Sequence, residues 1–277
     1  MHDITVRRMG FEFPDEIDPV FVPGEPEESY RIIGLSLLLP YLEPYLIRTM
    51  KVARQQIDDA DLLEDLERFS AQEGQHYREH MRFNAALRRE KFPGLATLEA
   101  ELAEDYQRFT RTRSLRFNLA YAEGFEALTT AVARFGFEER SLGEMDSPVA
   151  DLLAWHTIEE LEHRTVAFDV YNHVCGGYLY RLVFGLFGQW HLLRFVRRVI
   201  RYMLEADPEA VLRAGTPAER RARRRVQTRM ALRKLLPNVL STYLPWYTPH
   251  RIELTPEMQR VAQQYTARAK AVLSGPS

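Results

Sequence analysis

The sequence predicts an all-α protein in which a four-helix bundle holds a metal site. The helical spacing of apolar residues begins at Glu27 and continues along most of the 277 residues, and no alternating β-branched run is long enough for a strand. Two Glu-x-x-His motifs, Glu73–His76 and Glu160–His163, lie 87 residues apart. Positions i and i+3 share one helix face, so each motif directs a carboxylate and an imidazole to one point.

Prolines and glycines mark the ends of the elements expected in the first half of the chain. Residues 1–26 contain four prolines and predict an irregular arm laid over the core. A first helix is expected over about 28–58 and a second over about 61–89, where a Pro-Gly pair follows. A third helix, over about 97–137, should break around 110–114, where threonine and serine gather.

The second half of the chain predicts a fourth bundle helix followed by accessory helices over 178–277. The fourth helix has a proline in its first turn and is expected over 147–176, where two glycines end it. A fifth is expected over about 180–205. A sixth should begin after Thr216-Pro217 and carry an arginine-rich run, and a last one should begin at Thr255-Pro256.

Composition and charge limit which domain organisation, partners and metal sites are expected. No segment is composed like a linker, so residues 1–277 are expected to form a single domain. The net charge of −2 gives no reason to expect nucleic acid as a partner, and the single cysteine, Cys175, excludes a thiolate metal site. The apolar stretch 182–200 contains three arginines and is too polar to be an integral membrane segment. Its arginines are interpreted as the solvated face of a packed amphipathic helix, with contact to a membrane surface as the less favoured alternative. With no signal-like N-terminus, the expected location is cytoplasmic.

Two further helices offer the carboxylates that complete a ferritin-like dimetal site. Such sites combine two Glu-x-x-His motifs with one Glu from each of two other helices. Glu43 lies inside an apolar run of the first helix, where an uncompensated carboxylate would cost several kcal/mol. The third helix offers Glu123 and Glu126, and their spacing leaves both open.

The fourth helix carries an additional histidine. His156, Glu160 and His163 stand at i, i+4 and i+7, which is one stripe of a helix. Glu159 has nearly the same spacing to both histidines, but the parallel with Glu73–His76 favours Glu160. His80 is interpreted as a partner of the site and not as a ligand. Carboxylates and imidazoles without thiolates favour two iron ions, with manganese as the other suitable metal.

These motifs resemble a known family. The segment Phe69–Asn84 around Glu73–His76, and the segment Trp155–Tyr171 around His163, are similar to the second-helix and fourth-helix signatures of the family described as predicted metal-dependent hydrolases. Phe125–Thr129 is similar to its third-helix signature, except that Ala127 stands where histidine is common. The resemblance covers residues 30–180 well and the C-terminal third loosely.

The ligand spacing is also similar to that of the p-aminobenzoate N-oxygenases, which are ferritin-like di-iron enzymes with an extra histidine at the position of His156. This resemblance, and not the spacing, selects Glu126 over Glu123. It implies the following metal ligands: Glu43, Glu73, His76, Glu126, His156, Glu160 and His163.

The favoured hypothesis is a di-iron oxygenase that activates O₂ to oxidise a small organic substrate, with an amine as one candidate. Such an enzyme needs an electron donor, for example a reductase or a ferredoxin. The first alternative is a hydrolase in which the metals activate water. The second is an iron-handling or ferroxidase-type protein. A homodimer is the default expectation for the oligomeric state.

Overall fold

The computed structural model of the chain describes residues 4–139 and 147–274. In these residues every regular element is helical, and the single β-bridge joins Ile17 to Leu87. The all-α class is therefore confirmed. The helices of eight or more residues are α1 (Pro26–Ala53), α2 (Ala60–Ala86), α3 (Leu95–Thr112), α4 (Leu115–Glu139), α5 (Ser147–Glu162), α6 (Val166–Val174), α7 (Tyr178–Ala206), α9 (Pro217–Met230) and α11 (Pro256–Ser274).

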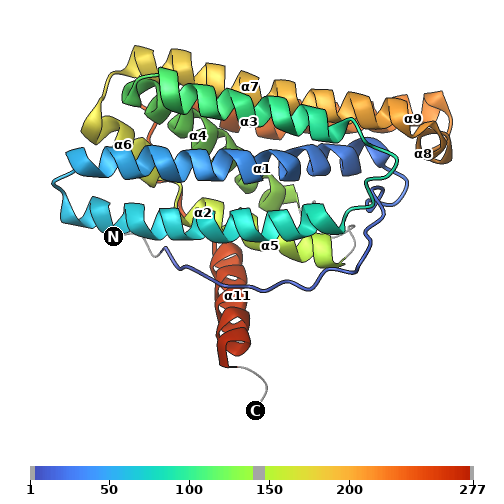
Figure 1. Cartoon of the computed structure of the whole chain (residues 1–277), viewed down its shortest axis with the longest axis horizontal. Coiled ribbons are helices and arrows are strands. Elements are labelled where there is room, and N and C mark those ends of the chain that lie inside the picture. The colour runs from blue at the N-terminus through green and yellow to red at the C-terminus, as the bar shows by residue number, and fades with distance from the viewer. Residues whose placement is uncertain (1–3, 140–146, 275–277) are drawn as a thin grey trace.

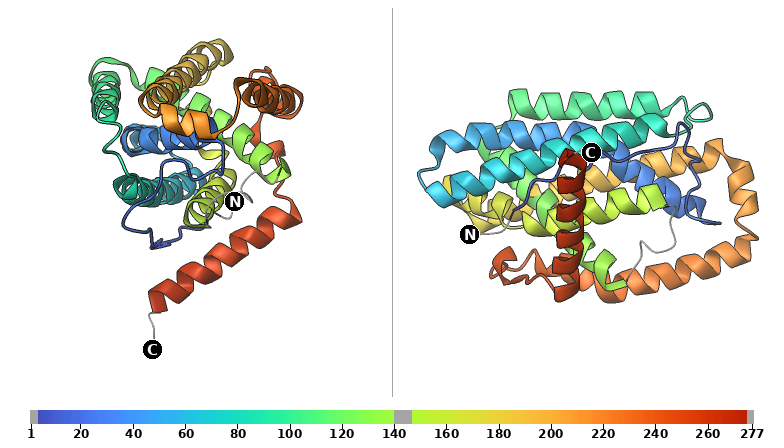
Figure 2. Two further views of the ribbon diagram at one scale, coloured as in Figure 1. Left: turned by 90° about the vertical axis from the view of Figure 1, so that its right-hand side faces the viewer. Right: turned by 90° about the horizontal axis from the view of Figure 1, so that it is seen from below.

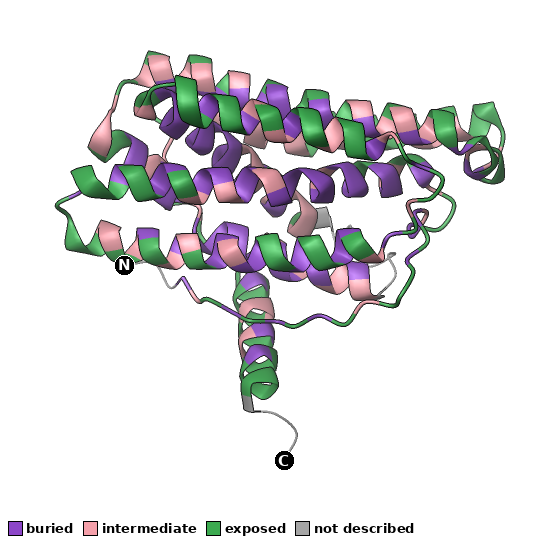
Figure 3. Ribbon diagram, viewed as in Figure 1, coloured by how far each residue is buried: buried purple, intermediate pink, exposed green. Residues whose placement is uncertain are grey.

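The helices α1, α2, α4 and α5 surround the centre of the bundle, and α1 lies between α2 and α7 (Figure 1). Helix α1 packs against α2, α3, α4 and α7, and buried residues recur from its first turn to its last (Figure 3). Helix α7 lies across α1 and α4 on the side of the bundle opposite α2 (Figure 1). Each of the four central helices therefore presents one face to the same interior.

A close crossing of two glycines holds α4 against α7. A Cβ atom on Gly124 would lie 2.2 Å from the Cα atom of Gly185, so neither side of this crossing has room for a side chain. Beside the crossing, the amide of Gln189 donates to the carbonyl oxygen of Gly124 at 2.8 Å. The backbone contact fixes the height of α4 in the bundle, and with it the position of the carboxylates that follow Gly124.

The fourth bundle helix is not continuous, and the expectation of one helix over 147–176 is wrong. Helix α5 ends at Glu162 and α6 begins at Val166. The backbone N–H of His163 still donates to the carbonyl oxygen of Glu159 at 3.1 Å, whereas that of Val166 donates to His163 in a tight turn. The turn directs α6 toward α2 and α4, where Val166 and Val170 are buried. His163 therefore keeps its helical register with Glu160.

The N-terminal arm crosses α2 and α5 and is covered by α11 (Figures 1 and 2). Its apolar side chains Ile4, Met9, Phe11 and Ile17 are buried, so the arm is part of the core surface. Helix α11 packs on α5, and Arg268 lies over the ring of Phe11. The described residues of the arm before Pro26 form no helix.

The other helices expected from the sequence are present, with small shifts in their ends. The break in the third helix is present between α3 and α4, and the two glycines after Cys175 end α6 with positive φ angles. Two features lack a clear signal in the sequence: the short helix α8 (Pro208–Arg213), and the π-helical turn η2 (Ala231–Leu235) that joins α9 to α10 (Leu236–Ser241). Every helix in the described part of the chain is too short or too polar to cross a bilayer.

Candidate metal centre

The structure brings all seven predicted ligands together in the interior of the bundle. Their potential ligand atoms form three overlapping groups, within each of which all atoms lie within 4.8 Å of one another. Glu73 and His76 each belong to two groups and so connect the three. All seven side chains are buried. The groups are Glu43, His76 and His156; Glu73, Glu126 and His163; and Glu73, His76 and Glu160.

Many polar atoms of this centre have no hydrogen-bond partner. Both carboxylate oxygens of Glu43 and of Glu126 are unpaired, as are one oxygen of Glu73 and one of Glu160. The Nδ1 atom of His76 and the Nε2 atom of His163 are also unpaired. More than nine in ten buried polar groups in proteins have a partner, so eight unpaired atoms in one place need an explanation. Cations among them would supply the missing partners.

The hydrogen bonds of His76 and His163 turn a lone pair of each ring toward the centre. Nε2 of His76 lies 3.1 Å from a carboxylate oxygen of Glu159, which only accepts, so Nε2 carries the proton. Nδ1 of His163 lies 2.9 Å from Oε1 of Gln72, whose amide nitrogen donates elsewhere, so Nδ1 carries the proton. The opposite nitrogen of each ring is then a free donor to a metal, as in sites whose outer partners fix the tautomer.

A chain of hydrogen bonds through His80 likewise fixes which ring nitrogen of His156 carries the proton. The amide of Asn84 donates to the carbonyl oxygen of Ser36, and the Ser36 hydroxyl donates to Oδ1 of Asn84 at 2.7 Å. Nδ1 of His80, 2.8 Å from that hydroxyl, must therefore donate. Burial lowers the pKa of His80, so the ring is neutral and its Nε2 accepts from Nδ1 of His156 at 2.8 Å.

The remaining nitrogen of His156 then has a lone pair directed at a carboxylate. Its Nε2 atom lies 2.9 Å from Oε1 of Glu160, and two acceptors at that distance need a cation or a proton between them. The ring of His156 also stacks on that of His76, with 4.1 Å between centroids. His80 thus holds His156 in place, as expected of a partner of the site.

Glu123 and Glu126 have different partners in the structure, which distinguishes their roles. Glu123 accepts from the buried guanidinium of Arg181 at 2.6 Å and so faces α7. Glu126 lies one helical turn further along, with a carboxylate oxygen 3.3 Å from Nε2 of His163. Because Glu123 already has a charged partner, Glu126 is the α4 carboxylate that faces the centre.

Glu159 and Glu160 also have different partners. Glu160 faces the centre, with oxygens 3.6 Å from Nε2 of His163 and 3.8 Å from Nδ1 of His76. Glu159 lies on the outer side of His76, where it accepts hydrogen bonds from that ring, from the indole N–H of Trp155 at 2.8 Å and from Arg7 at 3.0 Å. Glu159 therefore orients His76 and is itself neutralised by an arginine.

Arg7 of the N-terminal arm joins the outer partners of both Glu-x-x-His motifs. Its guanidinium donates to Glu159 at 3.0 Å and to Glu162 at 2.9 and 2.6 Å, and the side chain is only 2% exposed. Glu162 in turn accepts from the amide of Gln72 at 2.9 Å, and Gln72 holds His163. We call Arg7, Gln72, Glu159 and Glu162 the outer network.

The outer network was not predicted from the sequence. Glu159 and Glu162 both form buried salt bridges with Arg7. Nothing in helical spacing indicates that residue 7 reaches the centre, because the arm has no periodicity. Gln72 directly precedes Glu73 in the sequence. Only the packing of α5 beside α2 shows that the side-chain amide of Gln72 contacts His163.

The concentrated negative charge shifts the pKa values of the carboxyl groups. Burial, and then the neighbouring Glu73, raises the pKa of Glu43 well above its ordinary value. Burial, and then Glu160, raises the pKa of Glu126 from 4.5 to about 8. In metal-free protein near neutral pH, protons therefore occupy part of the centre. Metal ions must displace those protons, so metal affinity rises with pH.

We expect the metal-free protein to lose stability as the pH rises from about 5 to about 8. The folded state keeps a proton on Glu126 up to about pH 8, whereas the unfolded chain releases it near 4.5, so the folded state binds more protons in this window. Chemical denaturation at several pH values measures this loss. Saturating metal should remove the loss, and Glu126→Gln should weaken it in metal-free protein. Equal pH profiles of Glu126→Gln and the unsubstituted protein would contradict the assignment.

Comparison with known proteins supports a metal centre of this kind. The search of curated proteins and the search of solved structures gave no match. One family model matches residues 5–253, a span that includes the N-terminal arm, all seven predicted ligands and most of the accessory helices. That family is described as predicted metal-dependent hydrolases. The resemblance seen in the motifs is thus confirmed, and the chain belongs to the family of predicted metal-dependent hydrolases.

Proposed function

We propose that the seven residues bind two metal ions. The observation that carries this proposal is the set of eight unpaired buried atoms that face one another. The charges agree with it: the four carboxylates Glu43, Glu73, Glu126 and Glu160 carry four negative charges when ionised, and two divalent cations balance them while the histidines stay neutral. With a single divalent ion, two of the buried carboxylates would have to stay protonated to avoid an uncompensated charge.

Iron is the proposed metal, with manganese as the other suitable ion. Carboxylate oxygens suit hard cations and imidazole suits iron, whereas sulfur ligands would favour zinc or copper. The one cysteine, Cys175, lies outside the three groups of potential ligands.

The proposed reaction is oxidation of a small organic substrate by O₂. A di-iron centre supplies one-electron chemistry with O₂ when it is bound. The protein contributes burial that excludes bulk water, and the outer network and His80 hold the imidazoles in one orientation. For an amine substrate, RNH₂ + O₂ + 2e⁻ + 2H⁺ gives RNHOH + H₂O. The two electrons come from outside, which implies a reductase or a ferredoxin as partner.

A metal-dependent hydrolase is the second candidate, because the description of the family names that activity. Two metals lower the pKa of a bound water and stabilise a developing oxyanion, and this ligand set permits it. The two candidates differ in what they consume. A hydrolase works with a redox-inactive metal and without O₂, whereas an oxygenase needs both a redox-active metal and O₂.

The experiment therefore compares the same protein under two conditions. Protein loaded anaerobically with ferrous iron should consume O₂ and show a transient optical absorption, and an oxidisable amine should shorten the life of that absorption. Zinc-loaded protein without O₂ is tested in parallel on ester, amide and phosphate substrates. Hydrolysis by the zinc form, with an iron form inert to O₂, would establish the hydrolase. O₂ consumption that oxidises ferrous iron but no tested organic compound would favour iron handling.

A further inference from the structure

Two segments of the chain contain no acidic residue. Aspartate and glutamate make up 39 of the 277 residues, yet none occurs in 170–204 or in 220–252. The first segment carries five arginines, and the second carries eight arginines and one lysine. Since the whole chain has a net charge of −2, this strong positive charge is segregated from an acidic remainder.

Helix α7 lies in the first segment and exposes an apolar stripe. Its exposed residues follow helical spacing, and the stripe is about 21 Å long at a rise of 1.5 Å per residue. Trp190, in the stripe, is 55% exposed, and Arg194 lies over its ring. Further along the same face, Arg197 and Arg201 continue the exposed side. The stripe consists of Leu179, Val183, Leu186, Trp190 and Leu193.

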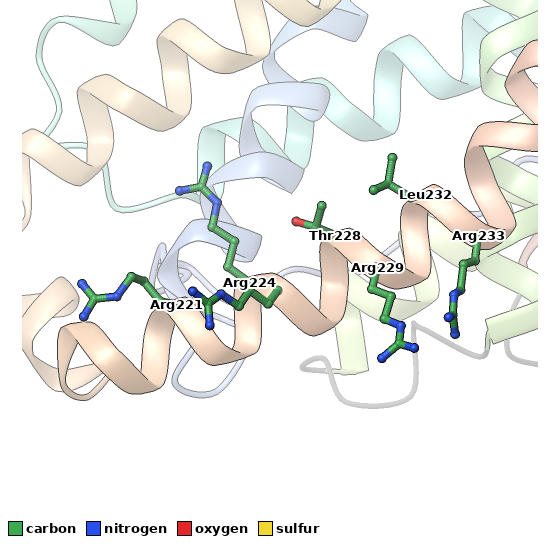
Figure 4. Close-up of a pocket in the computed structure, with 7 residues that line it drawn as sticks. Arg221, Arg224, Thr228, Arg229, Leu232 and Arg233 are labelled. Atoms are coloured by element: carbon green, nitrogen blue, oxygen red, sulfur yellow. The ribbon is translucent and has the colours of Figure 1, made fainter.

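All but the first turn of helix α9, and the π-turn η2, lie in the second segment and expose arginines. No side chain of α9 is buried, so packing against the bundle does not account for this helix. A hollow of about 550 Å³ lies along it, lined by five arginines with Thr228 and Leu232 (Figure 4). Arg229 and Arg233 project from the same side of the helix and form no salt bridge with any described residue (Figure 4). Within residues 4–139 and 147–274, these two arginines thus have no carboxylate partner.

The two segments lie on one side of the molecule. Helix α9 returns antiparallel to α7, and both lie on the side of the bundle away from α11 (Figures 1 and 2). The Tyr178 hydroxyl donates to the carbonyl oxygen of Tyr243 at 2.6 Å, which places the residues after α10 against the start of α7. Trp246, just beyond them, is 66% exposed. We call the exposed residues of α7, α9, α10 and Trp246 the basic apolar face.

We propose that the basic apolar face binds the surface of an anionic lipid membrane. Arginines attract anionic headgroups, tryptophan prefers the boundary between headgroups and acyl chains, and leucine and valine enter the apolar layer beneath. A nucleic acid or an acidic protein would satisfy the arginines but would leave the aliphatic stripe of α7 in water. The helices would lie parallel to the bilayer. Binding does not depend on the proposed oxidation, because no metal ligand belongs to this face.

Vesicle binding of the full chain tests the proposal. Vesicles of phosphatidylcholine alone are compared with vesicles that contain about one third phosphatidylglycerol, at about 0.1 M salt, where surface charges are only partly screened. The protein is expected to sediment with the anionic vesicles and not with the neutral ones, with or without metal. Lipids brominated in their acyl chains should quench Trp190 and Trp246, which are exposed, but not the fully buried Trp155.

Two double Arg→Glu variants with the same change in charge test whether the basic apolar face is the surface that binds lipid. Arg229→Glu/Arg233→Glu should weaken binding to anionic vesicles at least tenfold. Arg78→Glu/Arg260→Glu changes the charge equally at exposed positions on α2 and α11 and should leave binding within twofold. Trp190→Phe/Trp246→Phe should abolish lipid quenching while sedimentation persists. Circular dichroism checks that each variant is folded.

Three outcomes would overturn the proposal. One is equal binding by the two charge-reversed variants. Another is binding to anionic vesicles without quenching of Trp190 and Trp246, together with equally tight binding to DNA or polyglutamate, which would indicate a polyanionic partner. The third is a stable dimer in solution in which these two tryptophans are shielded from soluble quenchers, which would show that a second copy of the chain covers the face.

Discussion

Replacing Glu73 by glutamine is expected to weaken binding of the two metal ions strongly. Glu73 is the carboxylate shared by two of the three groups of potential ligands, so its charge serves both ions. We expect affinity to fall by at least about 100-fold, since even the outer partners of metal ligands are worth 10–100-fold. Anaerobic titration with ferrous iron, followed by elemental analysis, measures the change from about two ions per chain.

The control lies on the same helix. Glu79 is buried like Glu73, but it forms a salt bridge with Arg82 at 2.8 Å and faces away from the centre. Glu79→Gln should therefore keep the full metal content. If both variants bind two ions as well as the unsubstituted protein does, the carboxylates of α2 are not metal ligands and the dinuclear assignment is wrong.

Replacing Arg7 by alanine is expected to destabilise the protein and to weaken metal binding. The change leaves Glu159 and Glu162 buried without their cation, and breaking a buried ion pair in this way costs about 3–5 kcal/mol. His76 and His163 lose the anchored partners that orient them, so metal affinity should fall about 10–100-fold. Chemical denaturation of metal-free protein and metal titration of folded protein measure the two effects separately.

Arg8 provides the matched control for Arg7. Its side chain is exposed one residue along the arm, so Arg8→Ala should change stability by less than about 0.5 kcal/mol and leave metal binding unchanged. Arg7→Lys keeps the charge but not the planar fork, and it should recover part of both losses. A metal affinity of Arg7→Ala equal to that of Arg8→Ala would show that the arm only covers the core.

The sequence predicts much of the centre because its ligands obey short-range rules. Glu73 with His76, and His156 with Glu160 and His163, are placed together by the helix repeat alone, and the structure brings them together. The repeat holds for His163 even though α5 ends beside it, since the last helical hydrogen bond is made by its own N–H.

Other parts of the centre depend on contacts that no short-range rule contains. Glu123 and Glu126 are equivalent in spacing, and only Arg181 of α7 separates them. Glu159 and Glu160 are adjacent in the sequence, and Arg7 of the arm forms a salt bridge with Glu159. Both arginines come from segments distant in sequence, so their pairing depends on the packing of whole helices and of the arm.

The outer network also connects the N-terminal arm to the last helix of the described chain, which has a consequence for the order of events during synthesis. Arg7 donates to the hydroxyl of Thr266 in α11 across 259 residues of sequence, as well as to α5. At about 5–20 residues per second, a ribosome needs tens of seconds to travel that distance. Arg7 can therefore meet Glu159 and Glu162 once α5 has been made, but it is held from both α5 and α11 only after translation has passed α11.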